Sequence, residues 1–172
     1  MEHEATVEGI GVGVGDDGAG APVVLLSARD ELVPIFVSGD QAQSMQLAIE
    51  DEPFERPLTH DLLIEMISEF GAAIDRVRID DLADGTFYAK IDAEQYNSGS
   101  RKEAVFDARP SDGIAIALRV DCPIIVSDEV LDEAGRDPDE LGFVDEEDVR
   151  GDPDFGSEDD PGFGEDDDEF EF

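Results

Sequence analysis

The sequence predicts an α+β fold in which three to four helices pack on a curled, mostly antiparallel and barrel-like sheet. Two observations lead to this prediction. Short segments with alternating apolar and polar residues, typical of strands, recur along the chain and are separated by turn residues. Other segments carry apolar residues at helical spacing, and each begins beside a residue that favours a helix N-terminus.

The expected strands are mostly neighbours in the chain and therefore antiparallel. Three early segments predict a meander: 5–14, 22–26 and 32–37. The dipeptide Asp84-Gly85 is a strong hairpin signal between two further strands. A third strand, EAVFD (103–107), pairs back on that hairpin, and PIIV (123–126) is a short buried strand.

The first two expected helices are amphipathic. One runs from about Asp40 to Glu50. The other begins at Thr59 as N-cap and stops at Gly71, a residue suited to end a helix. Its apolar residues predict one buried stripe: Leu62, Leu63, Met66, Ile67 and Phe70.

A third helix, capped by Ser111, is apolar all round over IAIAL (114–118). It is therefore expected at the centre of the core. Ser127 or Asp128 starts a last short helix.

Charge is the unusual feature of the composition. The chain has 47 acidic and 11 basic residues, a formal net charge of −36, and only two of the basic residues are Lys. Acid excess with scarce Lys favours a halophilic protein of a molar-salt cytoplasm, where a Debye length of about 3 Å screens self-repulsion. The alternative is an acidic protein of ordinary cytosol whose surface mimics nucleic acid.

The chain divides into a domain over 1–135 and an acidic tail over 136–172. Residues 145–172 hold 15 acidic residues and one Arg, mixed with Gly, Pro and isolated Phe, so disorder is expected there. The tail is either a solvating appendage or an arm that recruits a partner. A lone Cys122, no signal peptide and no membrane-length apolar run together predict a cytoplasmic protein without disulfides.

Two similar segments stand out, RPLTHDLL (56–63) and ARPSDGIA (108–115). Proline, a hydroxyl residue and an early Asp explain both as helix starts without any chemistry. They do not explain Arg56, Arg109, Asp107 just before the second segment, or His60, the only histidine expected in the folded body. Two helix N-termini beside arginines would suit a phosphate, and nearby carboxylates would suit Mg²⁺ or Mn²⁺.

Five blocks, in order, resemble the bifunctional nuclease family. They are VEGIGVGVGDDGAGAPVVLL, VPIFVSGDQAQSMQLAI, RPLTHDLLIEMISEFGA, IDDLADGTFYAKI and FDARPSDGIAIALRVDCPIIVSDEVL. The resemblance runs from about Ala5 to Leu131 and implies an α+β fold, nuclease activity on DNA and RNA, and a homodimer or larger homo-oligomer.

Roles can be assigned to the polar residues of these blocks. Four are expected to be catalytic: His60 as proton shuttle, with Asp61, Asp107 and Asp112. The same three aspartates are the expected ligands of Mg²⁺ or Mn²⁺. Four others are expected to bind phosphate: Arg56, Arg109, Thr59 and Ser111.

Three functions therefore compete. The first is a metal-assisted nuclease of low sequence specificity. The second is a non-catalytic binding or regulatory module, in which the Arg–Asp pairs are structural and the tail recruits a partner. The third is nucleic-acid mimicry by the acidic surface. Convergence of His60, Asp107 and Arg109 in an open cleft favours the enzyme, whereas burial with mutual pairing favours the module.

Overall fold

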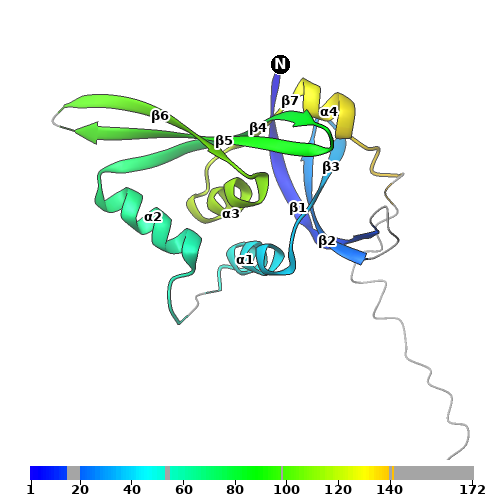
Figure 1. The fold of residues 1–172 in the computed structure, drawn as a ribbon, viewed down its shortest axis with the longest axis horizontal. Helices are drawn as coiled ribbons and strands as arrows, with labels where there is room; N and C mark the ends of the chain where they lie inside the picture. Colours follow the sequence, from blue (N-terminus) through cyan, green and yellow to red (C-terminus); the bar gives the residue numbers. More distant parts are fainter. Residues whose placement is uncertain (15–19, 53–54, 98, 140, 142–172) are drawn as a thin grey trace, which may run out of the picture. The chain divides into compact units, whose positions relative to one another are not determined.

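A seven-stranded sheet organises the chain in the computed structural model, which describes residues 1–14, 20–52, 55–97, 99–139 and 141 (Figure 1). Its strands are β1 (Glu2–Val14), β2 (Gly20–Ala28), β3 (Glu31–Phe36), β4 (Ala72–Ala83), β5 (Thr86–Asn97), β6 (Ser100–Ala108) and β7 (Ile124–Ser127). They lie in the order β3-β2-β1-β7-β4-β5-β6. The predicted meander is β1–β2–β3, and the predicted hairpin is β4–β5.

All neighbouring strands are antiparallel except β4 and β7, which are parallel. The α+β prediction is therefore confirmed. The sheet does not close into a barrel, because β3 and β6 are its two edges in the described residues. Short β7 enters between β1 and β4 and so joins the N-terminal meander to the later strands.

Four helices complete the described structure: α1 (Gly39–Ile49), α2 (Thr59–Glu69), α3 (Pro110–Val120) and α4 (Asp128–Ala134). Figure 1 shows α1, α2 and α3 on one side of the sheet, with α3 nearest to it. The apolar core of α3 is buried as predicted, with Ile114 and Ile116 at most 2% exposed. Gly113 permits this close packing, because an added Cβ would lie 2.7 Å from Val77 Cγ1.

The two predicted capping residues are not caps. Thr59 and Ser111 lie inside α2 and α3, whose N-caps are Leu58 and Arg109. Leu58 has no polar side chain, so Asp61 supplies the cap by accepting a hydrogen bond from the Leu58 backbone N–H at 2.8 Å. Ser127, in contrast, caps α4 by accepting from the backbone of Val130.

The apolar stripe of α2 is not buried, which corrects the prediction. No α2 residue is buried, and the side chains of Leu62 and Met66 are each 50% exposed. The stripe stays exposed because of where α2 lies in the fold. The short helix contacts α3 and β4 along the flank that carries Ile64, and nothing in the described chain covers its other flank.

The strand β1 begins at Glu2, earlier than predicted, so His3 also belongs to the folded body and His60 is not its only histidine. Asp128 at the start of α4 binds both the Met1 amine and His3 Nε2 at 2.6 Å. From 142 onward the predicted acidic tail lies outside the described residues. Arg136, the first residue of the predicted tail, pairs with Leu32 through two backbone hydrogen bonds. No helix of the described chain is long and apolar enough to cross a membrane.

Replacing Asp128 by Asn should lower stability at neutral pH and make the acid side of the stability curve flatter. Hydrogen bonds from the Met1 amine and His3 lower the Asp128 pKa from 3.8 to about 2. A lowered pKa adds stability above the unfolded value, and this is lost as pH falls from about 4 towards 2. Thermal unfolding of both proteins across this range measures the effect. Asp132→Asn, which removes an exposed carboxylate from the same helix, should show a smaller change; equal curves for the two variants would contradict the assignment.

Candidate functional site

The starts of α2 and α3 meet through two of the predicted site residues. His60 is the second residue of α2 and Asp112 the third of α3. His60 Nε2 lies 3.3 Å from Asp112 Oδ1, and the imidazole is 17% exposed. The two similar sequence segments therefore form one polar site rather than two separate helix starts.

A serine on α1 holds the other side of the imidazole. Ser44 Oγ lies 3.2 Å from His60 Nδ1 and also accepts a hydrogen bond of 3.1 Å from Arg119 Nη2. Arg119 can only donate, so the Ser44 hydroxyl hydrogen is free to be directed at Nδ1. In that arrangement the ring proton lies on Nε2 and is directed at Asp112.

Asp112 is shared between His60 and Arg109. Arg109 donates to the Asp112 carboxylate from Nε at 2.8 Å and from Nη2 at 3.1 Å. Burial raises the pKa of Asp112, but the hydrogen bonds from Arg109 and His60 outweigh burial and hold the pKa below its ordinary value. The Arg109 side chain is 71% exposed, and its Nη1 has no hydrogen-bond partner among the described residues. It can therefore contact an anion while keeping Asp112.

Asp61 has a structural partner instead. Its Oδ1 accepts from Arg119 Nε at 2.5 Å, and the Arg119 side chain is only 9% exposed. Arg119 also donates to the backbone oxygens of Ser44 and Ala115, so one guanidinium ties α1, α2 and α3 together. Burial raises the pKa of Asp61, yet the hydrogen bonds from Arg119 and the Leu58 backbone bring it below its ordinary value.

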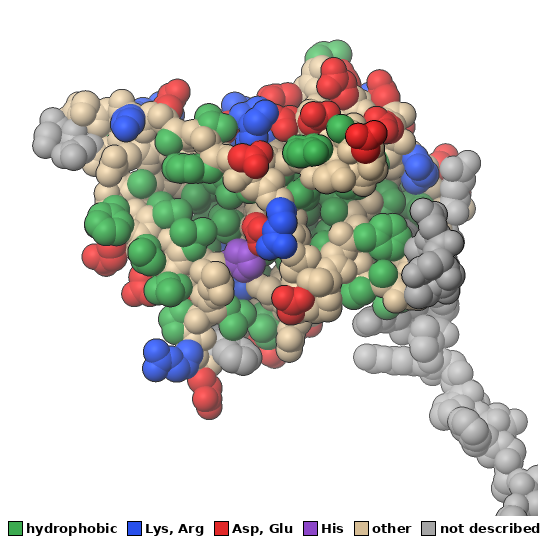
Figure 2. Space-filling model, in the orientation of Figure 1, with side chains coloured by type: hydrophobic (Ala, Val, Ile, Leu, Met, Phe, Trp, Pro, Cys, Tyr) green, Lys and Arg blue, Asp and Glu red, His purple; other side chains and the backbone are tan. Residues whose placement is uncertain are grey.

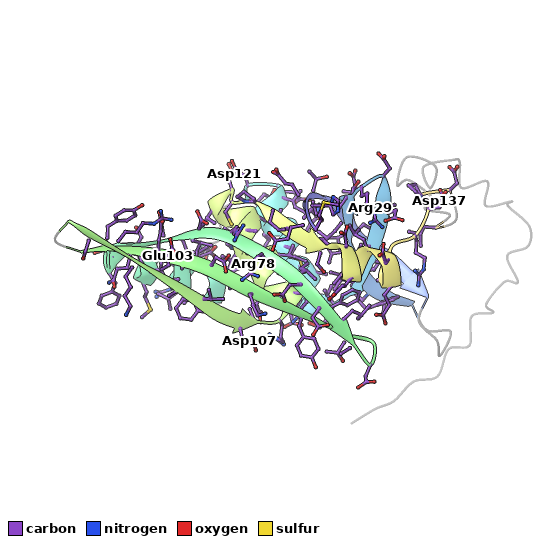
Figure 3. All side chains as sticks on the ribbon, turned by 90° about the horizontal axis from the view of Figure 1, so that it is seen from above. Arg29, Arg78, Glu103, Asp107, Asp121 and Asp137 are labelled. Atoms are coloured by element: carbon purple, nitrogen blue, oxygen red, sulfur yellow. The ribbon has the colours of Figure 1, made fainter. Side chains whose placement is uncertain are left out.

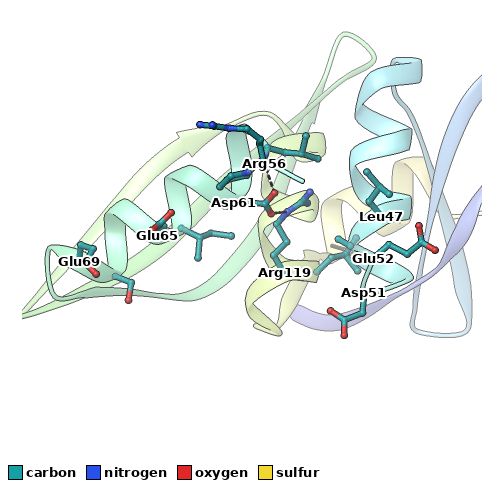
Figure 4. Close-up of a pocket in the computed structure, with 14 residues that line it drawn as sticks. Leu47, Asp51, Glu52, Arg56, Asp61, Glu65, Glu69 and Arg119 are labelled. Carbon is teal, nitrogen blue, oxygen red and sulfur yellow. Dashed lines mark hydrogen bonds and ion pairs between the residues drawn. The ribbon is translucent and has the colours of Figure 1, made fainter. Parts of the chain in front are cut away.

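A groove of about 850 Å³ lies between α1 and α2, with the Asp61–Arg119 pair in its wall (Figure 4). Arg56 lines this groove and has no ion pair with a described residue. Four further acidic residues line it: Asp51, Glu52, Glu65 and Glu69. The groove is thus dominated by acidic side chains, and no contact joins Arg56 to Arg109.

The other predicted site residues lie apart from this network. Asp107 pairs in register with Lys90, one position from buried Ala89, so its side chain faces the side of the sheet opposite α3. Figure 3 shows Asp107 at the margin of β6, away from the helices. Ser111 is only 7% exposed, too buried to contact a phosphate without rearrangement, and Thr59 is exposed without a hydrogen-bond partner among the described residues.

The three predicted metal ligands do not form a metal site in this structure. No group of three or more His, Cys, Asp or Glu side chains that could hold a metal occurs among the described residues. The Asp61 carboxylate is already bound by Arg119, and the Asp112 carboxylate by Arg109 and His60. Asp107 lies on the other side of the sheet. A hard divalent cation needs several oxygens converging on one point, and this donor set does not supply them.

Sequence reasoning missed Ser44 entirely and left Arg119 without a structural role. For Arg119 the sequence did contain one signal, since it is the charged residue of the last turn of α3 and directly follows the apolar run 114–118. Ser44 had none, because its neighbours in α1 are ordinary for an amphipathic helix. Both residues gain their roles only from the packing of α1 against α3.

Fold and site together define an α+β protein whose polar centre is a His–Asp pair linked to an exposed arginine. Residues 23–139 match the model of the bifunctional nuclease domain, and the chain belongs to this family. Two uncharacterized proteins from strains of Mycobacterium tuberculosis are each 41% identical over 118 residues, covering 66% of this chain and 66% of the relative.

Plant relatives carry a functional name. Bifunctional nuclease 2 of Oryza sativa subsp. japonica is 31% identical over 64% of this chain, and Bifunctional nuclease 1 of Arabidopsis thaliana is 30% identical over 64% of it. The match spans about a third of the length of these plant proteins, 34% and 35%. The chain is therefore similar to one part of each plant protein and not to its whole length.

Proposed function

We propose that this protein is a nuclease that hydrolyses phosphodiester bonds of DNA and RNA with low sequence specificity. Membership of the bifunctional nuclease domain family and the plant relatives of that name support the proposal. The observation that carries it is the position of His60, largely buried and held between Ser44 and Asp112 with an exposed Arg109 beside them.

In this proposal His60 carries the proton that hydrolysis requires. Its Nδ1 has the lone pair, so it receives the proton of the attacking water through the hydroxyl of Ser44, 3.2 Å away. The imidazolium that results is stabilised by the ionised Asp112 at Nε2. The same proton then passes to the oxygen that leaves the phosphorus.

Arg109 is the proposed phosphate contact. Its exposed guanidinium can bind a phosphate oxygen and stabilise the charge that develops during the reaction. A formal net charge of −36 opposes the approach of a polyanion in dilute salt, and molar salt removes most of this long-range repulsion. We therefore propose that the protein acts in a high-salt environment.

Mg²⁺ or Mn²⁺ remains part of the proposal only as a condition to be tested. Because the described carboxylates do not converge, none of the steps above passes through a metal ion. A metal that arrived with the substrate could also be held partly by the phosphate oxygens.

The test is cleavage of supercoiled plasmid and of end-labelled RNA in about 1 M KCl, where the Debye length is about 3 Å. Separate reactions contain Mg²⁺, Mn²⁺ or EDTA. We expect both substrates to be cut, and the EDTA reaction decides whether a divalent ion takes part. A folded protein that cuts neither substrate under any of these conditions would refute the nuclease proposal.

A second candidate is a non-catalytic binding module. The observation in its favour is that Asp61 pairs with Arg119 and Asp112 with Arg109, as expected if these ions serve structure. This candidate predicts nucleic acid or protein binding without any loss of substrate. Binding measured by fluorescence anisotropy with intact labelled RNA, in the absence of cleavage, would favour it.

A further inference from the structure

The flank of α2 that faces away from α3 is apolar and uncovered in the described chain. Four large side chains on it are substantially exposed: Leu62 50%, Leu63 42%, Met66 50% and Phe70 72%. Residues 62, 66 and 70 follow one another at a spacing of four, so they form a continuous ridge along the helix. A short helix gains most of its stability from burial of such a ridge, so exposure of this ridge requires an explanation.

Phe106 on β6 is a further exposed apolar side chain on the side of the sheet that carries α2. It pairs in register with Ile91, which faces the core, so Phe106 lies on the helix-bearing side of the sheet and is 55% exposed. The end of α2 is tied to the end of β5, since Gln95 Nε2 donates to the Phe70 carbonyl and the Tyr96 N–H to the Gly71 carbonyl. Figure 2 shows hydrophobic side chains gathered over this region, between α2 and the β5–β6 end of the sheet.

We call Leu62, Leu63, Met66, Phe70 and Phe106 the α2–β6 face. The β5–β6 ribbon above it is also incompletely covered on its other side, where Tyr96 is 60% and Val105 58% exposed. β6 is an edge strand whose outer backbone groups pair with no described strand. An uncovered edge strand that carries exposed apolar side chains is a surface on which another chain can pack.

The size of the α2–β6 face is that of one side of a stable dimer. With about 200 Å² for a fully exposed large apolar side chain, its five residues expose about 500 Å². A standard interface buries about 800 Å² per partner, of which about 60% is apolar. The face therefore supplies the apolar part of such an interface, and it lies in the upper part of the range of about 300 to 600 Å² for the largest apolar patch of a monomer, where such patches often mark interaction sites.

We propose that the α2–β6 face is covered by the same face of a second copy of this chain. All five side chains are uncharged, whereas the chain carries a formal net charge of −36. A nucleic acid presents its phosphate backbone outward and offers little apolar surface, so it is a poor cover for this face. A second copy presents an equally apolar face, and a two-fold axis lets one patch serve both subunits.

This interface has a distinctive dependence on salt. Two strongly acidic chains repel one another, and the Debye length falls from about 10 Å at 0.1 M to about 3 Å at 1 M salt. Apolar contacts are not screened, so the dimer should tighten at least tenfold over that range. An interface held by ion pairs would weaken instead.

The experiment is sedimentation velocity of the full chain from about 1 to 200 µM, in 0.1 M and 1 M KCl. We expect the mass of two chains, and at least a hundredfold weaker association for Met66→Lys, because each subunit would bring a charged ammonium into the apolar interface. Phe106→Ser, which adds no charge, should also weaken it by at least tenfold. Circular dichroism of each variant establishes that it is folded.

Ile49→Lys is the matched control, since Ile49 is 43% exposed at the end of α1 and outside the α2–β6 face. It should dimerise like the wild type. A single-chain mass for the wild type at every concentration would overturn the proposal, as would equal effects of Met66→Lys and Ile49→Lys. The proposal does not depend on nuclease activity, because mass is measured without substrate.

Discussion

His60→Gln should lower kcat for cleavage of DNA and RNA by about 10² to 10⁴-fold, the usual contribution of a positioned acid or base. Glutamine can still bridge Ser44 and Asp112 by hydrogen bonds, but it cannot carry a proton. KM should change little, because the proposed phosphate contact, Arg109, is left in place. Initial rates on a labelled RNA measure both constants.

The chain offers a matched control for this variant in its other histidine. His3 is part-buried like His60 and also contacts an aspartate, yet it lies in β1 with Asp128 rather than at the α2–α3 junction. His3→Gln should keep kcat within about twofold of the wild type. If the wild-type protein cleaves RNA and both variants retain its rate, the catalytic group lies elsewhere in the chain.

Arg119→Met should destabilise the protein by about 2 to 4 kcal/mol. The side chain is 9% exposed and donates to Asp61, to two backbone carbonyls and to Ser44, so its loss leaves several buried acceptors without partners. The expected loss of stability is smaller than the largest losses seen when a fully buried ion pair is broken, because Asp61 is 38% exposed and can be hydrated by water. Urea unfolding in molar KCl measures the change.

Arg109→Met provides the comparison at the other end of α3. Arg109 is also paired with an aspartate, but its side chain is 71% exposed, so the change should cost less than about 1 kcal/mol. The two variants separate the structural arginine from the proposed phosphate contact. An Arg119→Met cost no larger than that of Arg109→Met would show that the guanidinium does not hold the three helices together.

Secondary structure was largely predictable because its signals are local. The alternating pattern around Ile91, the Asp84-Gly85 turn and the apolar run of α3 each specify one element from neighbouring residues alone. The insertion of β7 between β1 and β4 was not predictable, since a four-residue strand carries no signal of its partners.

The candidate site was predictable only in part. The residues His60, Asp112 and Arg109 belong to the two segments that the sequence singled out, and the structure brings them together. Ser111 belongs to the second of these segments and Asp107 directly precedes it, yet both lie apart from the network: Asp107 on the opposite side of the sheet and Ser111 buried. Their neighbours in sequence do not decide this, because a single step along a strand or a helix turns a side chain to another side.

The sequence by itself determined the α+β class, the order of the main elements, the two similar helix starts and the acidic character of the chain. Only the tertiary structure decided that Asp61 is bound by Arg119, that Ser44 orients His60, and that the apolar ridge of α2 remains exposed. The reason is that periodicity shows which side of an element is apolar, whereas the element that packs against that side depends on distant parts of the chain.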